Sequence, residues 1–472
     1  MRAVVTDARL RVAVSIIRSL GEAGVSVVAA EASGTRNVLG YYSKFTSYRL
    51  RLSHSARTAP SAADLKALLE AAGEDGVVVP TFTSMVELLS RHAEEASTDG
   101  TRAERAHPGR TGTGGTLAER TYIERTLAKA SHVQRTRFKE TRNQNLLQAR
   151  EGDDIPSLPG ASGPRFLVPP LSSFRISHDK AQCFRLAKSL GVPVPETRFP
   201  RDEEASLDYA ADDGKDTKWA ERLPYPVIIK YRSGEDLGLP AAQRYCIARS
   251  PVEALQKYGE MDAIQESPLV QEYVEGEDWG AALLYDWQSR LVAAFTYKSI
   301  RERPKGAGPT VYAVSESCPE LVEYSHRVLS ALRWRGVAML DFRKGRDGKF
   351  RLLEINPRFW GSIALSILAG VDFPMLYYRC CLGEDIASRS HGTWPLFQED
   401  GVKVRFFPQD FLSLAQYAKH AGNTALRSMG YVAREGFKLL NPGLKDGLLS
   451  LSDPLPGLAY LVGGAFSRHG RT

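Results

Sequence analysis

The sequence lacks long apolar runs. None of its hydrophobic stretches approaches the roughly 20 residues that a membrane-spanning helix needs. Residues 1–7 also lack the apolar core of a signal peptide and are typical of a short strand. With 43% hydrophobic and 25% charged residues among 472, the composition favours a cytoplasmic protein without membrane contact. A chain of this length should divide into about two to four domains.

Cysteine is scarce and irregularly spaced. The chain has five cysteines, none in a paired motif of the kind that binds zinc or carries redox chemistry. Cys380 and Cys381 are adjacent in an apolar helical stretch, where core positions are the simpler interpretation. An odd number of cysteines without metal-binding spacing suits a reducing compartment. His178 and His326 are isolated, without the spacing of a catalytic triad, and neither is assigned a role.

Basic charge is in excess, but the excess is concentrated in one segment. The formal net charge is +7 and the pI is about 9.0. Residues 97–165 hold twelve basic and eight acidic residues, which is more than half of the excess. Because the rest of the chain is nearly balanced, the charge does not indicate nucleic-acid binding.

Residues 1–96 show alternating strand and helix patterns. Such alternation favours a small parallel sheet covered by helices on both faces. No Gly-x-Gly-x-x-Gly follows the first strand; Thr6-Asp7-Ala8-Arg9 occupies that turn, which argues against NAD binding. Gly21 is expected to end the first helix. The expected strands lie at 3–5, 25–29 and 77–80, and the expected helices at 10–20 and 62–72.

Residues 97–165 differ in composition from the rest of the chain. Ser, Thr, Gly and Arg dominate, and the segment 116–148 has too few apolar residues to bury a helical face. We expect a low-complexity insertion, disordered or weakly helical, between a helix ending near Glu95 and a strand at 165–169. Its deletion should leave the fold intact. Residues 386–472 mix helical stretches with Pro-rich turns, and no chemistry is recognisable there.

The run from Leu352 to Arg358 gives the strongest functional signal. It alternates with the period of two that is typical of a strand, which places Glu354 and Asn356 on one face. A strand-like stretch at 337–342 precedes it, and the Gly-rich turn between the two stretches predicts a hairpin.

In such a hairpin Asp341 lies opposite or diagonal to Glu354. Asp341, Glu354 and Asn356 would then bring three oxygen-bearing side chains together. Mg²⁺ binds such oxygens while it shares the phosphate oxygens of a nucleotide. The simpler alternative is a strand whose carboxylates are solvated and which ends at an Asn-Pro step.

With Arg358 and the following residues 359–362, this strand pair resembles the metal-binding strands of the ATP-grasp superfamily. The similar branches are the carbamoyl-phosphate-synthase-like and the carboxylate–amine-ligase enzymes. The resemblance covers about residues 166–385, where several weak motifs follow the family's order. It implies a mixed α/β and α+β fold with four parts. These are a Rossmann-like pre-ATP-grasp domain (1–96), the insertion (97–165), a two-lobed ATP-grasp domain (166–385) and a C-terminal extension (386–472).

The resemblance also implies residues that hold the phosphates of ATP. Ser177 would cap a helix carrying Lys180, and Lys230 would end the buried strand 224–230. Both ammonium groups would neutralise phosphate charge. The segment 233–238 takes the place of the family's Gly-rich loop, although it has only two glycines.

The strand at 268–274 resembles the family's hinge. The resemblance assigns adenine to the side chain of Gln271 or Glu272 and to the backbone of Val274. It assigns the ribose to Glu277 or Asp278. An acid-rich hairpin on a solvated face is the alternative reading of this segment.

What the resemblance implies for function is an ATP- and Mg²⁺-dependent ligase, with Mn²⁺ as a substitute metal. The enzyme would activate a carboxylate as an acyl phosphate, which an amine, or less readily a thiol, attacks. Asp341, Glu354 and Asn356 would hold the metal, and Arg358 and Arg301 would serve as catalytic residues. The sequence does not decide which of Lys298, Arg301 and Arg303 faces the site.

Two alternatives remain open at this stage. One is bicarbonate or carbamoyl-phosphate chemistry on the same residues, and the other is a non-catalytic ATP-binding regulatory module. The expected partners are a small-molecule carboxylate and an amine, with no nucleic acid and no membrane. Because relatives are often dimers, a homodimer is a further expectation. The sequence does not name the substrates.

Overall fold

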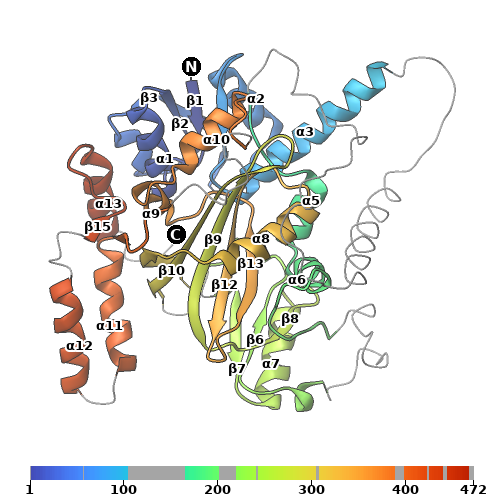
Figure 1. Ribbon diagram of the computed structural model, residues 1–472, viewed down its shortest axis with the longest axis vertical. Coiled ribbons are helices and arrows are strands. Elements are labelled where there is room, and N and C mark those ends of the chain that lie inside the picture. The colour runs from blue at the N-terminus through green and yellow to red at the C-terminus, as the bar shows by residue number, and fades with distance from the viewer. Residues whose placement is uncertain are drawn as a thin grey trace, which may run out of the picture.

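The computed structural model describes residues 2–56, 58–104, 165–200, 219–235, 237–240, 243–304, 308–387, 398–421, 425–438 and 444–466. Within these residues the chain forms three sheets, one in each of three lobes (Figure 1). The mixed α/β and α+β class expected from the sequence is confirmed.

The N-terminal lobe is a four-stranded parallel sheet in the order β3-β2-β1-β4. The third strand was not expected, because most of its ten residues are exposed or half-buried and lack a continuous apolar face. The strands are β1 (Arg2–Val5), β2 (Ser26–Ser33), β3 (Thr46–Ser55) and β4 (Val77–Val79). The helices are α1 (Arg11–Glu22), η1 (Leu39–Tyr42), α2 (Ala62–Ala72) and α3 (Thr83–Glu104).

Three boundary predictions in this region are wrong. Gly21 does not end α1 but lies within it, packed so closely on Phe45 that a Cβ would sit 2.4 Å from the Phe45 Cβ. The helix instead gives way to Gly24, whose φ of +82° suits glycine. Helix α3 continues to Glu104 rather than ending near Glu95. The strand expected at 165–169 is a single parallel bridge between Arg165 and β4.

The central lobe is a seven-stranded sheet in the order β13-β12-β9-β10-β11-β14-β15. Its two last strands come from the C-terminal segment, so the sheet is completed only by residues far along the chain. The bounds are β9 (Gly276–Tyr285), β10 (Leu291–Glu302), β11 (Thr310–Ser315), β12 (Gly336–Gly345), β13 (Phe350–Asn356), β14 (Lys403–Arg405) and β15 (Leu444–Asp446).

Helices cover both faces of the central sheet and make two separate cores. On one face α1 and the N-terminal lobe pack with α9 (Ile363–Leu368) and α10 (Phe373–Cys381). On the other face lie α5 (Leu171–His178), α6 (Lys180–Ser189) and α8 (Pro319–Ala331). Cys380 and Cys381 are buried in the first core, as expected.

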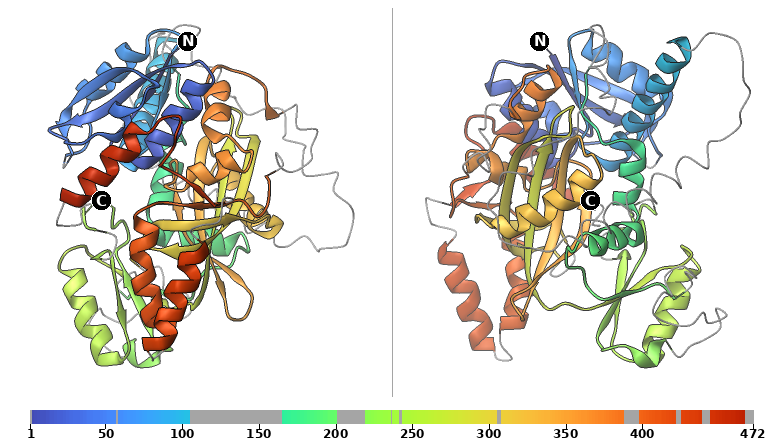
Figure 2. Two further views of the ribbon diagram at one scale, coloured as in Figure 1. Left: turned by 90° about the vertical axis from the view of Figure 1, so that its left-hand side faces the viewer. Right: turned by 45° about the vertical axis from the view of Figure 1, so that its right-hand side comes forward.

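The third lobe is a small sheet in the order β5-β8-β6-β7, which stands apart from the other two lobes in the right-hand view of Figure 2. Helix α7 (Pro251–Asp262) covers one face, so Val227, Ile229 and Val270 form a small core beneath it. The bounds are β5 (Thr197–Arg198), η3 (Ala220–Arg222), β6 (Val227–Lys230), β7 (Tyr245–Ala248) and β8 (Leu269–Glu272).

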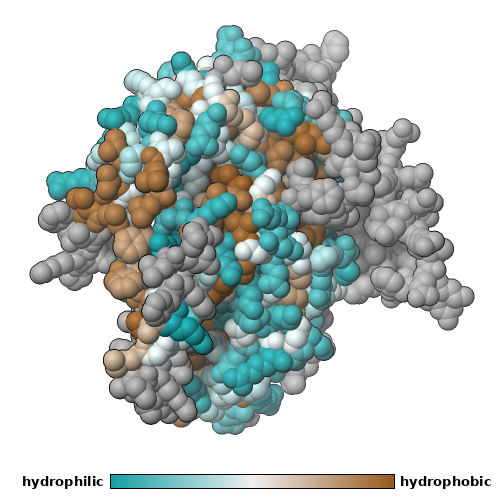
Figure 3. Space-filling model, turned by 60° about the vertical axis from the view of Figure 1, so that its left-hand side comes forward, coloured by the Kyte–Doolittle hydropathy of each residue, from teal (hydrophilic) through white to brown (hydrophobic). Residues whose placement is uncertain are grey.

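The remaining helices are α11 (Gln409–Ala421), α12 (Ala425–Lys438) and α13 (Leu455–Phe466). Four apolar side chains near and on α13 are more than half exposed: Leu451, Leu455, Leu458 and Val462. Figure 3 shows hydrophobic surface gathered on the left of the face on which the C-terminal helices lie. Among the described helices none has the length and apolarity to cross a membrane.

Candidate functional site

The hairpin of β12 and β13 brings the expected oxygen ligands together. Asp341 and Glu354 are direct cross-strand partners. Two residues away along each strand, Asn356 pairs with Met339. The Asn356 amide Nδ2 donates to Asp341 Oδ2 at 2.9 Å. Two carboxylates and one amide therefore converge on one face of the sheet.

The acidic groups of this hairpin repel one another and are partly compensated by nearby lysines. Burial raises the pKa of Asp341 well above its usual range, and the like charges of Glu354 and Asp278 add to the effect. Glu354 lies deep in the cleft, yet 40% of its side-chain surface remains exposed. Burial opposes its ionisation, but Lys180 and Lys230 outweigh burial and lower the pKa of Glu354 to about 2. A divalent ion would relieve the repulsion between the two acids.

This donor set fits Mg²⁺ rather than a softer metal. Oxygen ligands from two carboxylates and an amide suit a hard cation that keeps some of its water. Within the described ranges no group of three or more His, Cys, Asp or Glu side chains is arranged to hold a metal. Three oxygen ligands from Asp341, Glu354 and Asn356 would leave other coordination positions of such a cation for phosphate oxygens.

Helix α6 delivers the first lysine. Asp179 caps this helix, because its carboxylate accepts hydrogen bonds from the backbone N–H groups of Ala181 and Gln182. The prediction of Ser177 as the cap is wrong, since Ser177 lies inside α5. From the first turn of α6, Lys180 Nζ reaches Glu354 Oε2 at 3.3 Å.

The second lysine, Lys230, ends β6 and is held from the neighbouring strand β8. Its Nζ donates to Gln271 Oε1 at 2.9 Å, and Gln271 Nε2 donates to Thr197 Oγ1 at 2.8 Å. Burial lowers the pKa of Lys230 to about 8, with a further contribution from the like charge of Lys180. Gln271 is 1% exposed, so it acts first as the support of Lys230.

Neighbouring side chains of the hinge strand point to opposite faces of the sheet. Glu272 neighbours Gln271 and points to the opposite face of β8, where it pairs with Arg351 at 3.2 Å. The Val274 carbonyl accepts from Arg343 Nη1 at 3.4 Å. After the hinge, Asp278 binds Arg343 at 2.6 Å.

Of the two acids considered for the ribose, the geometry favours Asp278. The opposite-facing Glu277 binds Lys298 at 2.6 Å, beside the buried Trp279. Asp278 instead shares the face of the sheet on which Asp341 lies, because Arg343 is two residues beyond Asp341 and pairs with Asp278.

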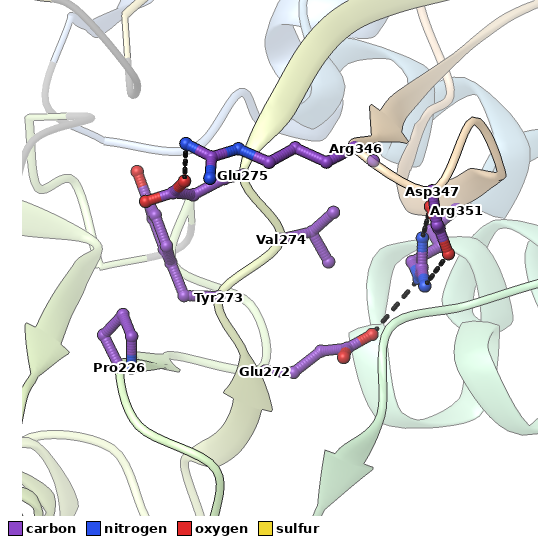
Figure 4. Close-up of a pocket in the computed structure, with 9 residues that line it drawn as sticks. Pro226, Glu272, Tyr273, Val274, Glu275, Arg346, Asp347 and Arg351 are labelled. Carbon is purple, nitrogen blue, oxygen red and sulfur yellow. Dashed lines mark hydrogen bonds and ion pairs between the residues drawn. The ribbon is translucent and has the colours of Figure 1, made fainter.

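A pocket of about 260 Å³ opens at the hinge (Figure 4). Pro226, Tyr273 and Val274 supply apolar wall, while ion pairs join Arg351 to Glu272 and Asp347. Glu272, which points away from Gln271 and Lys230, and the next residue, Tyr273, both line this pocket.

The basic segment on β10 does not enter the site. Arg301 is 2% exposed and binds Asp410 at 2.6 Å and Glu435 at 2.9 Å, both in the C-terminal helices. The bulge in β10 between Ser299 and Arg301 turns this guanidinium away from Asp341. The structure therefore contradicts a catalytic role for Arg301. Its neighbours Lys298 and Arg303 are engaged with Glu277 and Gln409, respectively.

Sequence reasoning missed Glu302 and Arg343. The bulge that turns Arg301 outward leaves Glu302 beside Asp278, and burial followed by the charge of Asp278 raises the pKa of Glu302 to about 9. Arg343 could have been found, because it lies two residues beyond Asp341 on the same strand face. The bulge that places Glu302 beside Asp278 has no evident sequence signal.

Arg358 follows β13 and connects the sheet with the N-terminal lobe. Its Nη2 lies 3.3 Å from Glu235 Oε1, and its Nε donates to Thr83 Oγ1 at 3.3 Å. Its guanidinium carbon is 5.9 Å from the centre of the Phe82 ring. Arg358 thus connects the end of β13 with Glu235 of the segment 233–238 and with Thr83 of the N-terminal lobe.

Comparisons with known proteins agree with this geometry. The D-alanine–D-alanine ligase of Aquifex aeolicus is 27% identical over 215 residues, covering 43% of this chain and 67% of that protein. The D-alanine–D-alanine ligase of Halorhodospira halophila is 27% identical over 192 residues, covering 38% of this chain and 55% of that protein. The chain thus matches between about half and two thirds of the length of these curated relatives.

Two solved structures show the same fold at low identity. The N5-carboxyaminoimidazole synthetase of Staphylococcus aureus, complexed with ADP, has a TM-score of 0.51 and 10% identity, covering 89% of this chain and 96% of that chain. The biotin carboxylase domain of the 2-oxoglutarate carboxylase of Hydrogenobacter thermophilus, solved with MgADP and bicarbonate, has a TM-score of 0.50 and 16% identity. That match covers 85% of this chain and 73% of the other.

The fold and these comparisons support a place for the chain among the ATP-grasp carboxylate–amine ligases. Residues 265–396 match the family model described as "ATP-grasp in the biosynthetic pathway with Ter operon". This match contains the hinge and both metal strands.

Proposed function

We propose that the protein uses ATP and Mg²⁺ to activate a small-molecule carboxylate as an acyl phosphate, which an amine then attacks to form a C–N bond. The observation that carries the proposal is the convergence of Asp341, Glu354 and Asn356 with Lys180 in one cleft. The ligase relatives support the same reaction class.

In this proposal Asp341, Glu354 and Asn356 hold Mg²⁺, with Mn²⁺ as a substitute. The bound ion would neutralise the charge of the phosphate oxygens that it contacts. Metal binding would favour the ionised form of Asp341, whose pKa is raised by burial and by the neighbouring carboxylates. Asn356 would turn its amide oxygen toward the ion in place of its hydrogen bond to Asp341.

The cations of the cleft have separate tasks. Lys180 and Lys230 would neutralise the triphosphate from α6 and from β6. Asp278 and the Val274 backbone would hold the ribose and adenine, with Gln271 fixing Lys230 beside them. Arg358 would bind the transferring phosphoryl group, for which its planar donor fork is suited.

The reaction then needs little covalent chemistry from the protein. A carboxylate oxygen attacks the γ-phosphorus, the bond to ADP breaks, and an acyl phosphate forms. The amine attacks the acyl carbon, phosphate leaves, and the amine loses one proton. Phosphoryl transfer depends mainly on positioning and charge stabilisation, which the residues above would supply.

The test is ADP release from ATP and Mg²⁺ with a pool of the proteinogenic amino acids as carboxylates and amines. Glu354→Gln should lower turnover by roughly 100-fold or more while the melting temperature stays near that of the wild type. Glu260→Gln, on the exposed surface of α7, is the matched control. Full activity of Glu354→Gln would eliminate the proposed metal site.

A bicarbonate-dependent reaction is the second candidate, because it uses the same metal and phosphate groups. Bicarbonate added without amino acids would then release ADP. Nucleotide binding without turnover under either condition would instead favour a regulatory module.

A further inference from the structure

The side chain of Glu235, in the segment 233–238 of the third lobe, contacts the N-terminal lobe. Glu235 Oε2 accepts a hydrogen bond from Thr83 Oγ1 at 2.6 Å, and Glu235 Oε1 lies 3.3 Å from Arg358 Nη2. Arg244 adds a longer contact to the same oxygen at 3.9 Å. The hydrogen bond between Thr83 and Glu235 joins residues 152 positions apart in the sequence.

The Glu235 carboxylate is ionised and well enclosed. Its side chain is 18% exposed. Burial opposes its charge, but Arg358 and the hydrogen bond from Thr83 together lower the pKa of Glu235 below its usual value. A charged hydrogen bond of this kind is worth more than an exposed surface pair, because the site is partly shielded from water.

Glu235 pairs with Arg358, which the proposed function assigns to the transferring phosphoryl group. Arg358 also contacts Thr83 Oγ1, the Phe359 carbonyl and the ring of Phe82. An incoming phosphate oxygen would have to compete with the Glu235 carboxylate for Arg358. The contacts therefore describe an anion site that is filled by the protein's own carboxylate.

We propose that Glu235 is an internal anion that occupies the Arg358–Thr83 site in the ligand-free protein, and that the γ-phosphate of ATP displaces it. The inference rests on the proposed function in taking Arg358 as the phosphoryl-binding cation. Because Glu235 lies in the loop over the phosphates, its release frees that loop from the N-terminal lobe as the triphosphate arrives. The carboxylate thus makes the protein discriminate between nucleotides with and without a γ-phosphate.

The need to displace Glu235 lowers the apparent affinity for a nucleotide that carries a γ-phosphate. The loss grows with the fraction of molecules in which Glu235 contacts Arg358 and Thr83. A nucleotide that ends at the β-phosphate does not reach Arg358 and has no such competitor. Loss of the carboxylate should therefore tighten the binding of a γ-phosphate analogue alone.

The experiment measures equilibrium binding of MgAMPPNP and MgADP to the full chain by calorimetry. Glu235→Gln should bind MgAMPPNP about tenfold more tightly than the wild type, while its affinity for MgADP stays within about twofold. Thr83→Val should shift MgAMPPNP binding in the same direction by a smaller factor. Thr83→Ser retains the hydroxyl group and should restore the wild-type value, and Glu260→Gln is the surface control.

Each contrary result has one meaning. Unchanged MgAMPPNP affinity in Glu235→Gln, or weaker affinity, refutes the displacement. Equal tightening of both nucleotides also refutes it, because the effect would then be general charge removal. If the wild type and all variants fail to bind either nucleotide, the result refutes the proposed function and, with it, this inference.

Discussion

Lys230 shows how a single side chain can set the pH range of a site. Enclosure by the small lobe and the nearby charge of Lys180 lower its pKa to about 8, and Gln271 fixes its position. The ammonium form, which attracts phosphate, therefore predominates only below about pH 8. Above that pH the free protein presents a neutral amine to the nucleotide.

Nucleotide affinity should accordingly fall as the pH rises through 8. The sign follows from the lowered pKa, because deprotonation removes a positive charge that the phosphates need. Calorimetric titration of MgADP between pH 7 and 9.5 would measure the fall. Lys230→Arg keeps its charge throughout this range, so a persisting decline in that variant would assign the effect to another group.

At the residue scale, the sequence indicated much of the proposed site but not the side-chain contacts that join it to another lobe. The period of two in β13 was enough to place Glu354 and Asn356 on one face with Asp341 opposite. The contact between Thr83 and Glu235 was invisible, because nothing in either segment indicates a partner in another lobe.

Local irregularities decide which side chains of an element face the cleft. In β10 the bulge around Ile300 reverses the alternation, so Arg301 faces the C-terminal helices and Glu302 approaches Asp278. Sequence alternation assumes an unbroken ladder and cannot anticipate this reversal. The same limit applies to β14 and β15, since strands of three residues carry no periodic signal.

Replacing Arg301 should reveal a structural role. Arg301→Met would leave Asp410 and Glu435 buried without their cation, which should cost about 3–5 kcal/mol of unfolding free energy. Denaturant unfolding would measure the loss, and ADP release per folded molecule should remain close to that of the wild type. A catalytic arginine would give the reverse pattern, with turnover lost and stability retained.

At the scale of the whole molecule, the N-terminal lobe and the central sheet share one hydrophobic core, whereas the small sheet has its own core and reaches the N-terminal lobe through side chains such as Glu235. The alternation of strand and helix patterns predicted the N-terminal sheet apart from β3, and the two-lobed domain was expected from the family resemblance. The sequence did not anticipate that the C-terminal segment completes the central sheet. Those two short strands depend on tertiary pairing, which local patterns do not encode.

The segment 105–164 lies outside the described residues, and its expected disorder stays a prediction. Replacing it with a flexible Gly/Ser linker should leave the melting temperature and MgADP binding unchanged. On either side, α3 and Arg165 are anchored to the N-terminal lobe, the latter by hydrogen bonds with Gly76 and Val78. Thermal unfolding of the shortened chain is the measurement, and insoluble product would show that the segment is needed for folding.

The edge strand β15 has a consequence for synthesis on the ribosome. Its residues, 444–446, pair with β14 only after the emerging polypeptide has passed them through the exit tunnel. Until then the neighbouring strand presents unpaired N–H and C=O groups, a template for contact with other nascent chains. Late in translation this edge of the central sheet is therefore open to pairing with other chains.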